Sequence, residues 1–118
     1  MRILLDHGVP KPFGREFPAH DVKTTAQMGW DDLRNGKLLT AAAAELFGVV
    51  PTVDKNMKRE QNLTRLPVSV IVLDVIKNTP AVLRPFAPFV ERVLPTLPKG
   101  QMLEINERGE VTMIAPGR

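Results

Sequence analysis

The sequence predicts one α/β domain spanning residues 1–118, with a mostly parallel central sheet, helices on both faces and a C-terminal hairpin. Short apolar runs alternate with helical patterns along the chain, which is typical of a parallel sheet covered by helices. The length of 118 residues suits a single domain. Gln101–Ile105 and Glu110–Ile114 flank the turn sequence NERG, and this pattern predicts the hairpin.

The first half of the chain opens with two strands and two helices. Arg2–Leu5 is a short apolar run, as expected for a buried strand. Pro10–Phe17 carries a proline where a short helix would begin. His20–Thr25 is rich in residues that favour strands. A longer helix is expected over GKLLTAAAAEL, with Asn35 as its N-cap and Gly48 as the residue that ends it.

The second half continues the alternation. Gly48–Val53 is expected to be a strand, in which Pro51 indicates an edge position or a bulge. Asn56–Leu63 predicts a basic helix. Val68–Leu73 (VSVIVL) is the clearest strand in the sequence. Pro80–Leu94 has the apolar spacing of a helix, but Pro85 and Pro88 should kink it or restrict it to short pieces.

Composition narrows the class of protein. The chain has no cysteine, which excludes disulfides and thiolate metal sites and favours a reducing compartment, so a cytoplasmic protein is expected. No apolar run is long enough to span a bilayer, and Asp6 interrupts the opening one, so we expect neither a membrane segment nor a signal peptide. A net charge of +3 is compatible with nucleic-acid binding.

Three of the predicted strands run directly into an aspartate: RILLD ends at Asp6, VVPTVD at Asp54 and VIVLD at Asp74. The carboxyl ends of parallel strands lie along one edge of a sheet, where ligands of α/β proteins bind. Converging carboxylates repel one another, and Mg²⁺ or Mn²⁺ would relieve that repulsion. Such an ion can activate water for phosphodiester cleavage. The alternative is that each aspartate only caps a turn.

Four basic residues, Lys55, Lys58, Arg59 and Arg65, follow Asp54 closely. They are candidates for holding a nucleic-acid backbone. The alternative is that they form the solvated face of a helix.

Three further features are open to two interpretations. His7 adjoins Asp6 and could contact a phosphate, although a single histidine in a loop is more often polar surface. Trp30 could stack on a base or simply pack. Asp31 and Asp32 could supply further acids, but in a polar turn they are more often solvated.

Four segments resemble one known group of proteins. MRILLDHGVP resembles the opening motif of PIN-like proteins, which are related to bacterial toxin ribonucleases. MGWDDLRNGKLLTAAA resembles the central turn and helix of that group. VVPTVDKNM resembles its hallmark strand followed by an acid, and NLTRLPVSVIVLD its next strand. The resemblance covers about the first 75 residues, and the remainder more loosely.

The resemblance implies a three-layer PIN-like fold, a pocket that binds Mg²⁺ or Mn²⁺, RNA as substrate and a cognate antitoxin as protein partner. Asp6 and Asp54 match two acids of the family and would be the catalytic residues and primary metal ligands. Asn35 and Asn56 fall where many relatives carry further acids, and would be auxiliary metal ligands. Because an amide brings no negative charge, both positions weaken the metal site.

Three hypotheses follow. The first is a metal-dependent ribonuclease of the toxin–antitoxin type. The second is a catalytically weak or inactive PIN-like module that binds nucleic acid or a protein partner, which the missing acids favour. The third is a flavodoxin-like or receiver-like domain that is phosphorylated on Asp54. It is disfavoured because an early acidic pair and a late lysine are absent. Apolar residues in the last third also suit a homodimer surface.

Overall fold

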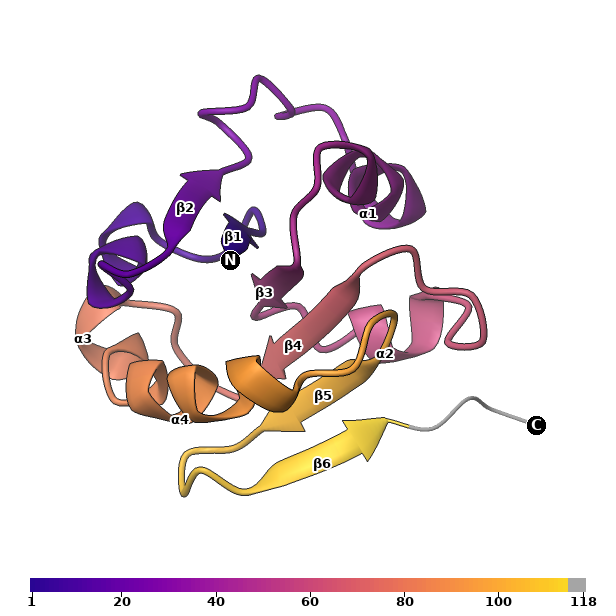
Figure 1. The fold of residues 1–118 in the computed structure, drawn as a ribbon. Helices are drawn as coiled ribbons and strands as arrows, with labels where there is room; N and C mark the ends of the chain where they lie inside the picture. The colour runs from indigo at the N-terminus through magenta and orange to yellow at the C-terminus, as the bar shows by residue number, and fades with distance from the viewer. Residues whose placement is uncertain (115–118) are drawn as a thin grey trace.

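The structure, a computed structural model, describes residues 1–114, so residues 115–118 of the predicted domain lie outside it. A six-stranded sheet forms the centre of the molecule (Figure 1). Its strands are β1 (Arg2–Leu5), β2 (Asp21–Thr24), β3 (Val49–Thr52), β4 (Ser69–Leu73), β5 (Met102–Ile105) and β6 (Val111–Ile114). The α-helices are α1 (Asn35–Ala44), α2 (Met57–Glu60), α3 (Pro80–Leu83) and α4 (Phe86–Val93), and the 3-10 turns are η1 (Lys11–Glu16) and η2 (Leu94–Thr96).

The strands lie in the order β2-β1-β3-β4-β5-β6. The first five are parallel, and β6 pairs antiparallel with β5. The predicted α/β class with a mostly parallel sheet is therefore confirmed. The order 2-1-3-4-5 is that of flavodoxin-like sheets, in which the chain builds outward to β2 and then crosses β1 to continue at β3. A crevice is expected between β1 and β3, where this change of direction occurs.

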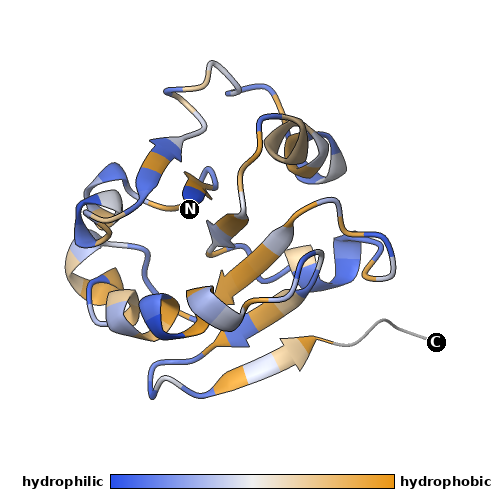
Figure 2. Ribbon diagram, viewed as in Figure 1, coloured by the Kyte–Doolittle hydropathy of each residue, from blue (hydrophilic) through white to orange (hydrophobic). Residues whose placement is uncertain are grey.

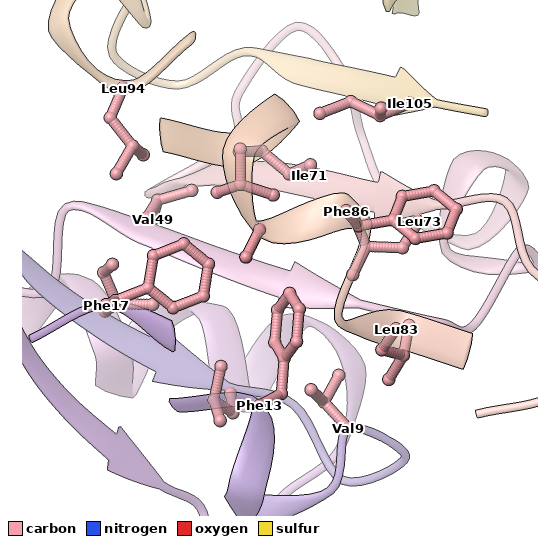
Figure 3. Packing of buried hydrophobic residues seen from close by; sticks show 14 of the residues in the cluster. Val9, Phe13, Phe17, Val49, Ile71, Leu73, Leu83, Phe86, Leu94 and Ile105 are labelled. Carbon is pink, nitrogen blue, oxygen red and sulfur yellow. The ribbon is translucent and has the colours of Figure 1, made fainter. Parts of the chain in front are cut away.

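The sheet separates two apolar cores, because successive side chains of a strand point to opposite faces. In β1, Ile3 and Leu5 enter one core and Leu4 enters the other. The first core is filled from η1, α3, α4 and η2, and Figure 3 shows its packing. The second is filled mainly from α1 and residues around α2. In Figure 2 the central strand β4 is largely apolar, whereas the helices alternate apolar and polar residues.

Pro51 lies in a central strand, so the expectation of an edge position was wrong. The carbonyl oxygen of Pro51 accepts the backbone N–H of Asp6 at 3.1 Å, and so the missing N–H of Pro51 faces β1 as well. On that side the register is the single pair Ile3↔Val49, whereas β3 pairs with β4 along its whole length. The proline is tolerated because it faces the neighbour with which β3 pairs least.

Both predicted ends of the long helix need correction. The helix begins at Asn35 itself, in a left-handed backbone conformation (φ 52°), and no side chain caps it. It ends at Ala44 rather than near Gly48. Leu46 adopts φ 63°, and the N–H groups of Leu46 and Phe47 donate to the carbonyls of Ala43 and Ala42. This is a Schellman ending with leucine in the position that glycine usually occupies.

The other helices are short. The predicted basic helix is a single turn, Met57–Glu60. The segment Pro80–Leu94 is divided as expected, because Pro85 lies between α3 and α4 and cannot supply the N–H that a continuous helix needs. Within residues 1–114, no helix combines the length and apolar character needed to cross a membrane.

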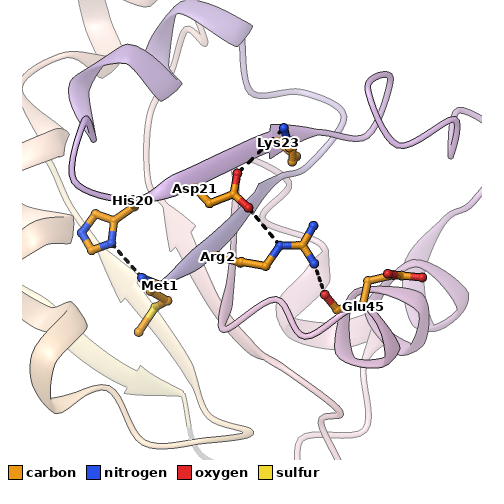
Figure 4. Close-up of polar contacts among 6 residues, drawn as sticks. All are labelled: Met1, Arg2, His20, Asp21, Lys23 and Glu45. Atoms are coloured by element: carbon orange, nitrogen blue, oxygen red, sulfur yellow. Dashed lines mark hydrogen bonds and ion pairs between the residues drawn. The ribbon is translucent and has the colours of Figure 1, made fainter.

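Polar groups near the amino end of β1 are paired with one another (Figure 4). Arg2 forms an ion pair with Asp21 on β2 at 3.1 Å and also donates to the carbonyl oxygen of Glu45 after α1. The N-terminal amine lies 3.3 Å from Nδ1 of His20. These contacts join β1 to β2 and to the end of α1.

Candidate functional site

The candidate site begins with Asp6, the residue directly after β1. Its backbone N–H bonds Pro51 and so extends the pairing of β1 with β3 by one step. The side chain is buried, with 7% of the residue exposed. Its Oδ2 accepts a hydrogen bond of 2.7 Å from the hydroxyl of Thr52, which is itself fully buried. Asp6 is therefore held in a fixed position beside the end of β3.

The same hydroxyl also fixes Asp54. The backbone N–H of Asp54 donates to Oγ1 of Thr52 at 3.0 Å. Oδ1 of Asp54 in turn accepts the N–H of Asn56 at 3.0 Å, which is the local turn that leads into α2. Through one threonine hydroxyl, the two aspartates belong to a single hydrogen-bonded unit across β1 and β3.

A pocket of about 200 Å³ lies where the carboxyl ends of β1 and β3 meet. The crevice expected from the strand order is therefore present. The structure brings Asp6, Asp54 and Asn35 together in its lining, although they are far apart in the sequence. The complete lining is Asp6, His7, Gly8, Arg34, Asn35, Asp54 and Met57.

Asn56 does not line this pocket. Its amide oxygen accepts a hydrogen bond of 2.9 Å from Nη2 of Arg59, and its backbone N–H serves Asp54. In this conformation Asn56 supports the turn that follows β3.

Asp74 lies apart from the two other strand-end aspartates, because β4 is on the far side of β3. It lines a separate, open hollow of about 450 Å³ and forms an ion pair of 2.7 Å with Lys55. Arg108 in the same hollow pairs with Glu110, and a hydrogen bond from Asn106 together with the charge of Arg108 lowers the pKa of Glu110. Two of the charged residues that line the larger hollow, Asp74 and Arg108, therefore already have ion-pair partners.

Most of the basic residues proposed to hold nucleic acid already have side-chain partners. Lys55 pairs with Asp74, Lys58 pairs with Glu104 at 2.7 Å, and Arg59 donates to Asn56. Arg65 is exposed. Exposed ion pairs contribute little stability, so a phosphate could displace the partner of Lys55 at small cost.

Two residues with side-chain nitrogens, His7 and Arg34, also line the pocket. The sequence analysis considered His7 as a candidate phosphate contact but did not select Arg34. Nε2 of His7 lies 2.7 Å from the carbonyl oxygen of Leu33, and Nδ1 of His7 lies 3.2 Å from the hydroxyl oxygen of Thr25. Arg34 lies beside it, with Nη1 at 2.8 Å from Nε2 of His7. Arg34 stands in a polar turn, DDLRN, where no periodic pattern singles it out.

Trp30 has the packing role that was one of its two interpretations. It is partly buried against the second core and meets the ring of Phe47 edge-on, at 6.1 Å between centroids. Asp31 and Asp32 are exposed and do not line the pocket.

The donor set of the pocket fits a hard divalent cation that keeps part of its water shell. Within residues 1–114, no three or more histidine, aspartate or glutamate side chains gather closely enough to enclose an ion. Mg²⁺, however, commonly binds through one or two carboxylates, with waters and substrate phosphates as its other ligands. In the described part of the chain neither Asp6 nor Asp54 forms an ion pair, and one oxygen of each has no hydrogen-bond partner.

No family model matches the chain, and neither the curated proteins nor the solved structures contain a significant match. The functional interpretation therefore depends on the geometry of the pocket and on the motifs in the sequence.

Proposed function

We propose that the chain is a PIN-like endoribonuclease of the toxin–antitoxin type that depends on Mg²⁺ or Mn²⁺, with Asp6 and Asp54 as its primary ligands. One observation carries the proposal. The two acids that the sequence motifs assign to a metal line the same pocket, at the switch point of the sheet, where α/β proteins bind ligands.

The roles of the residues follow from their contacts. Asp6 and Asp54 would hold the cation through the oxygens that have no protein partner. Thr52 keeps both acids in place, so little reorganisation is needed when the ion binds. Asn35 would add a neutral carbonyl ligand. A bound Mg²⁺ or Mn²⁺ supplies an activated water and neutralises charge on the phosphoryl oxygens.

The arrangement of the elements supports the finer assignment to a three-layer PIN-like fold with a C-terminal hairpin. Apolar cores cover both faces of the sheet, and β5 and β6 pair antiparallel. The strand order is also that of flavodoxin-like sheets, which is compatible with the hypothesis that Asp54 is phosphorylated. The residues after the strands disfavour that hypothesis. One acid, Asp6, follows β1 instead of a pair, and Asn106, Glu107 and Arg108 follow β5 instead of a lysine.

The second candidate is a PIN-like module that binds RNA or an antitoxin-like protein partner but cleaves slowly or not at all. The observation that favours it is the donor set, since two carboxylates of residues 1–114 line the pocket and Asn56 is engaged by Arg59. Fewer negative charges mean weaker binding of a divalent cation.

The test is cleavage of single-stranded RNA in the presence of Mn²⁺ by the wild type, Asp6→Asn, Asp54→Asn and Asp74→Asn. Asp74→Asn is the matched control, because it makes the same chemical change at a strand end outside the pocket. We expect Mn²⁺-dependent cleavage by the wild type and the control, and its loss in the other two. Equal cleavage by Asp6→Asn would refute the proposal. Binding of RNA without cleavage by any of the four would support the second candidate.

A further inference from the structure

The pocket has two chemically different sides. Asp6 and Asp54 supply carboxylates from the ends of β1 and β3. Arg34, next to the start of α1, supplies a guanidinium, and His7 supplies an imidazole. Within residues 1–114 the guanidinium forms no ion pair with either acid. The Arg34 guanidinium and the two carboxylates share the pocket without pairing with one another. This indicates a ligand that would lie between them.

Both ring nitrogens of His7 have protein partners. Nδ1 lies 3.2 Å from the hydroxyl of Thr25, and Nε2 lies 2.7 Å from the carbonyl oxygen of Leu33 and 2.8 Å from Nη1 of Arg34. Nη1 of Arg34 donates to the carbonyls of Asp31 and Leu33. The imidazole and one nitrogen of Arg34 are therefore structural.

The rest of the guanidinium remains available. In the part of the chain that the structure describes, all hydrogen bonds of the Arg34 side chain run through Nη1. Its Nε and Nη2 carry three further N–H groups, arranged in the planar fork that matches two oxygens of a phosphate. Because Nη1 is anchored to two carbonyls, the fork is oriented before any ligand binds.

The charges of such a ligand can be inferred from those around it. A divalent cation and Arg34 bring three positive charges, and the carboxylates of Asp6 and Asp54 bring two negative ones. One further negative charge, that of a phosphodiester, would balance the pocket. A phosphate bound at once by the cation and by the arginine would be fixed in position for attack by a water.

The size of the pocket indicates which part of a nucleic acid it would take. Its volume of about 200 Å³ is below the roughly 300 Å³ at which sites that enclose a whole small molecule begin. Apart from His7, no aromatic side chain lines it, and Trp30 is used in packing. There is room for a phosphodiester group, while the bases on either side would stay outside.

We propose, building on the ribonuclease assignment above, that Arg34 binds a non-bridging phosphate oxygen of the RNA backbone. The site therefore recognises the phosphodiester and not the base. Its substrate class is single-stranded RNA of any sequence, bound by its backbone across the crevice between β1 and β3.

The experiment measures binding of fluorescent ten-nucleotide RNAs of uridine, adenosine or cytidine by anisotropy, with Ca²⁺ or with EDTA, for the wild type, Arg34→Gln, Arg34→Lys and Lys99→Gln. Lys99→Gln is the matched control, because it removes one positive charge from an exposed residue before β5, at the other edge of the sheet. Calorimetric titration with Mn²⁺ is carried out on the same proteins.

We expect Arg34→Gln to weaken binding of all three RNAs about tenfold. It should also reduce the dependence of log affinity on log salt by about 0.7, the value of one lost phosphate contact on a single strand. Arg34→Lys should recover part of the loss, and Mn²⁺ affinity should not fall in any variant, because Arg34 is not a metal ligand and its charge repels the cation. If Arg34→Gln also lowers the melting temperature, its weaker RNA binding is not by itself evidence of a lost phosphate contact. The RNA affinity of Arg34→Lys then decides, because this variant keeps the positive charge.

Equal RNA affinity for Arg34→Gln and Lys99→Gln would overturn the role of Arg34, and a loss confined to one base would overturn backbone recognition. The two proposals can fail separately. If Mn²⁺ does not bind the wild type while Arg34→Gln still weakens RNA binding in EDTA, the ribonuclease assignment fails and the role of Arg34 stands.

Discussion

Thr52 offers the sharpest test of how the acids are held, because one hydroxyl serves both of them. It donates to Oδ2 of Asp6 and accepts the backbone N–H of Asp54. The substitution Thr52→Val keeps the shape of a fully buried, branched side chain and removes only that hydroxyl. We expect it to destabilise the fold and to weaken metal binding together.

The magnitude follows from the burial of the two groups left without a partner. Asp6 is 7% exposed, so its oxygen loses a partner that water replaces poorly, at a cost of about 1–3 kcal/mol. The N–H of Asp54 is partly buried and loses about 0.5–1.5 kcal/mol. The free energy of unfolding should fall by about 1.5–4.5 kcal/mol, against a typical total of about 5–15 kcal/mol. The affinity for Mn²⁺ should fall at least about tenfold, as for other residues that orient metal ligands.

The assay is urea denaturation with linear extrapolation, together with calorimetric titration of Mn²⁺. Thr52→Ser is the matched control, because it keeps the hydroxyl and loses only a methyl group, at a cost of about 1 kcal/mol. The serine variant should bind Mn²⁺ nearly as the wild type does. If the valine and serine variants have the same stability and the same Mn²⁺ affinity, the reasoning from the shared hydroxyl is wrong.

Three further substitutions test other parts of the fold by urea denaturation. Leu46→Gly should stabilise the protein by about 1 kcal/mol, because Leu46 has φ 63° and is 80% exposed, so that glycine relieves strain and little packing is lost; a destabilised variant would contradict this. Ile71→Ala should lower the free energy of unfolding by about 2–5 kcal/mol, since the side chain is fully buried in the first core; a loss below 1 kcal/mol would mean that the core collapses around the gap. Arg2→Met should cost about 1–2 kcal/mol, because it removes the bond to the Glu45 carbonyl, the stacking of the guanidinium 4.1 Å above the Phe47 ring and the pair with Asp21. In 1 M salt the ion pair with Asp21 is screened, so the difference in stability between the wild type and Arg2→Met should shrink only by the contribution of that pair. If the difference disappears completely in 1 M salt, the other two contacts contribute nothing.

Strand positions could be predicted well because strands buried on both faces have near-continuous apolar sequences. VSVIVL predicted a strand over Val68–Leu73, and the structure has Ser69–Leu73. Helix ends were harder. Asn35 and Gly48 carry the usual signals for the two ends of a helix, yet the tertiary contacts place the last turn at Ala44. Burial of Phe47 in the second core requires the chain to reverse there, which leaves Leu46 in a conformation that its own preference disfavours.

The site was partly predictable for a related reason. The pattern of a strand ending in an aspartate singled out Asp6, Asp54 and Asp74 alike. Only the strand order separates Asp74 from the other two, because β4 is not beside β1. Arg34 had no local signal, since its place in the pocket depends on how the turn before α1 folds back over the end of β1.

The amino-acid sequence by itself determined the α/β class, the strands and the aspartates at three strand ends, because hydrophobic periodicity and strand ends are properties of neighbouring residues. The tertiary structure alone decided which strand ends adjoin, that one threonine hydroxyl joins two aspartates, and that an arginine 28 residues beyond Asp6 lies in the same pocket. The physical reason is that contacts between residues distant in sequence depend on the packing of whole elements, which no local pattern encodes.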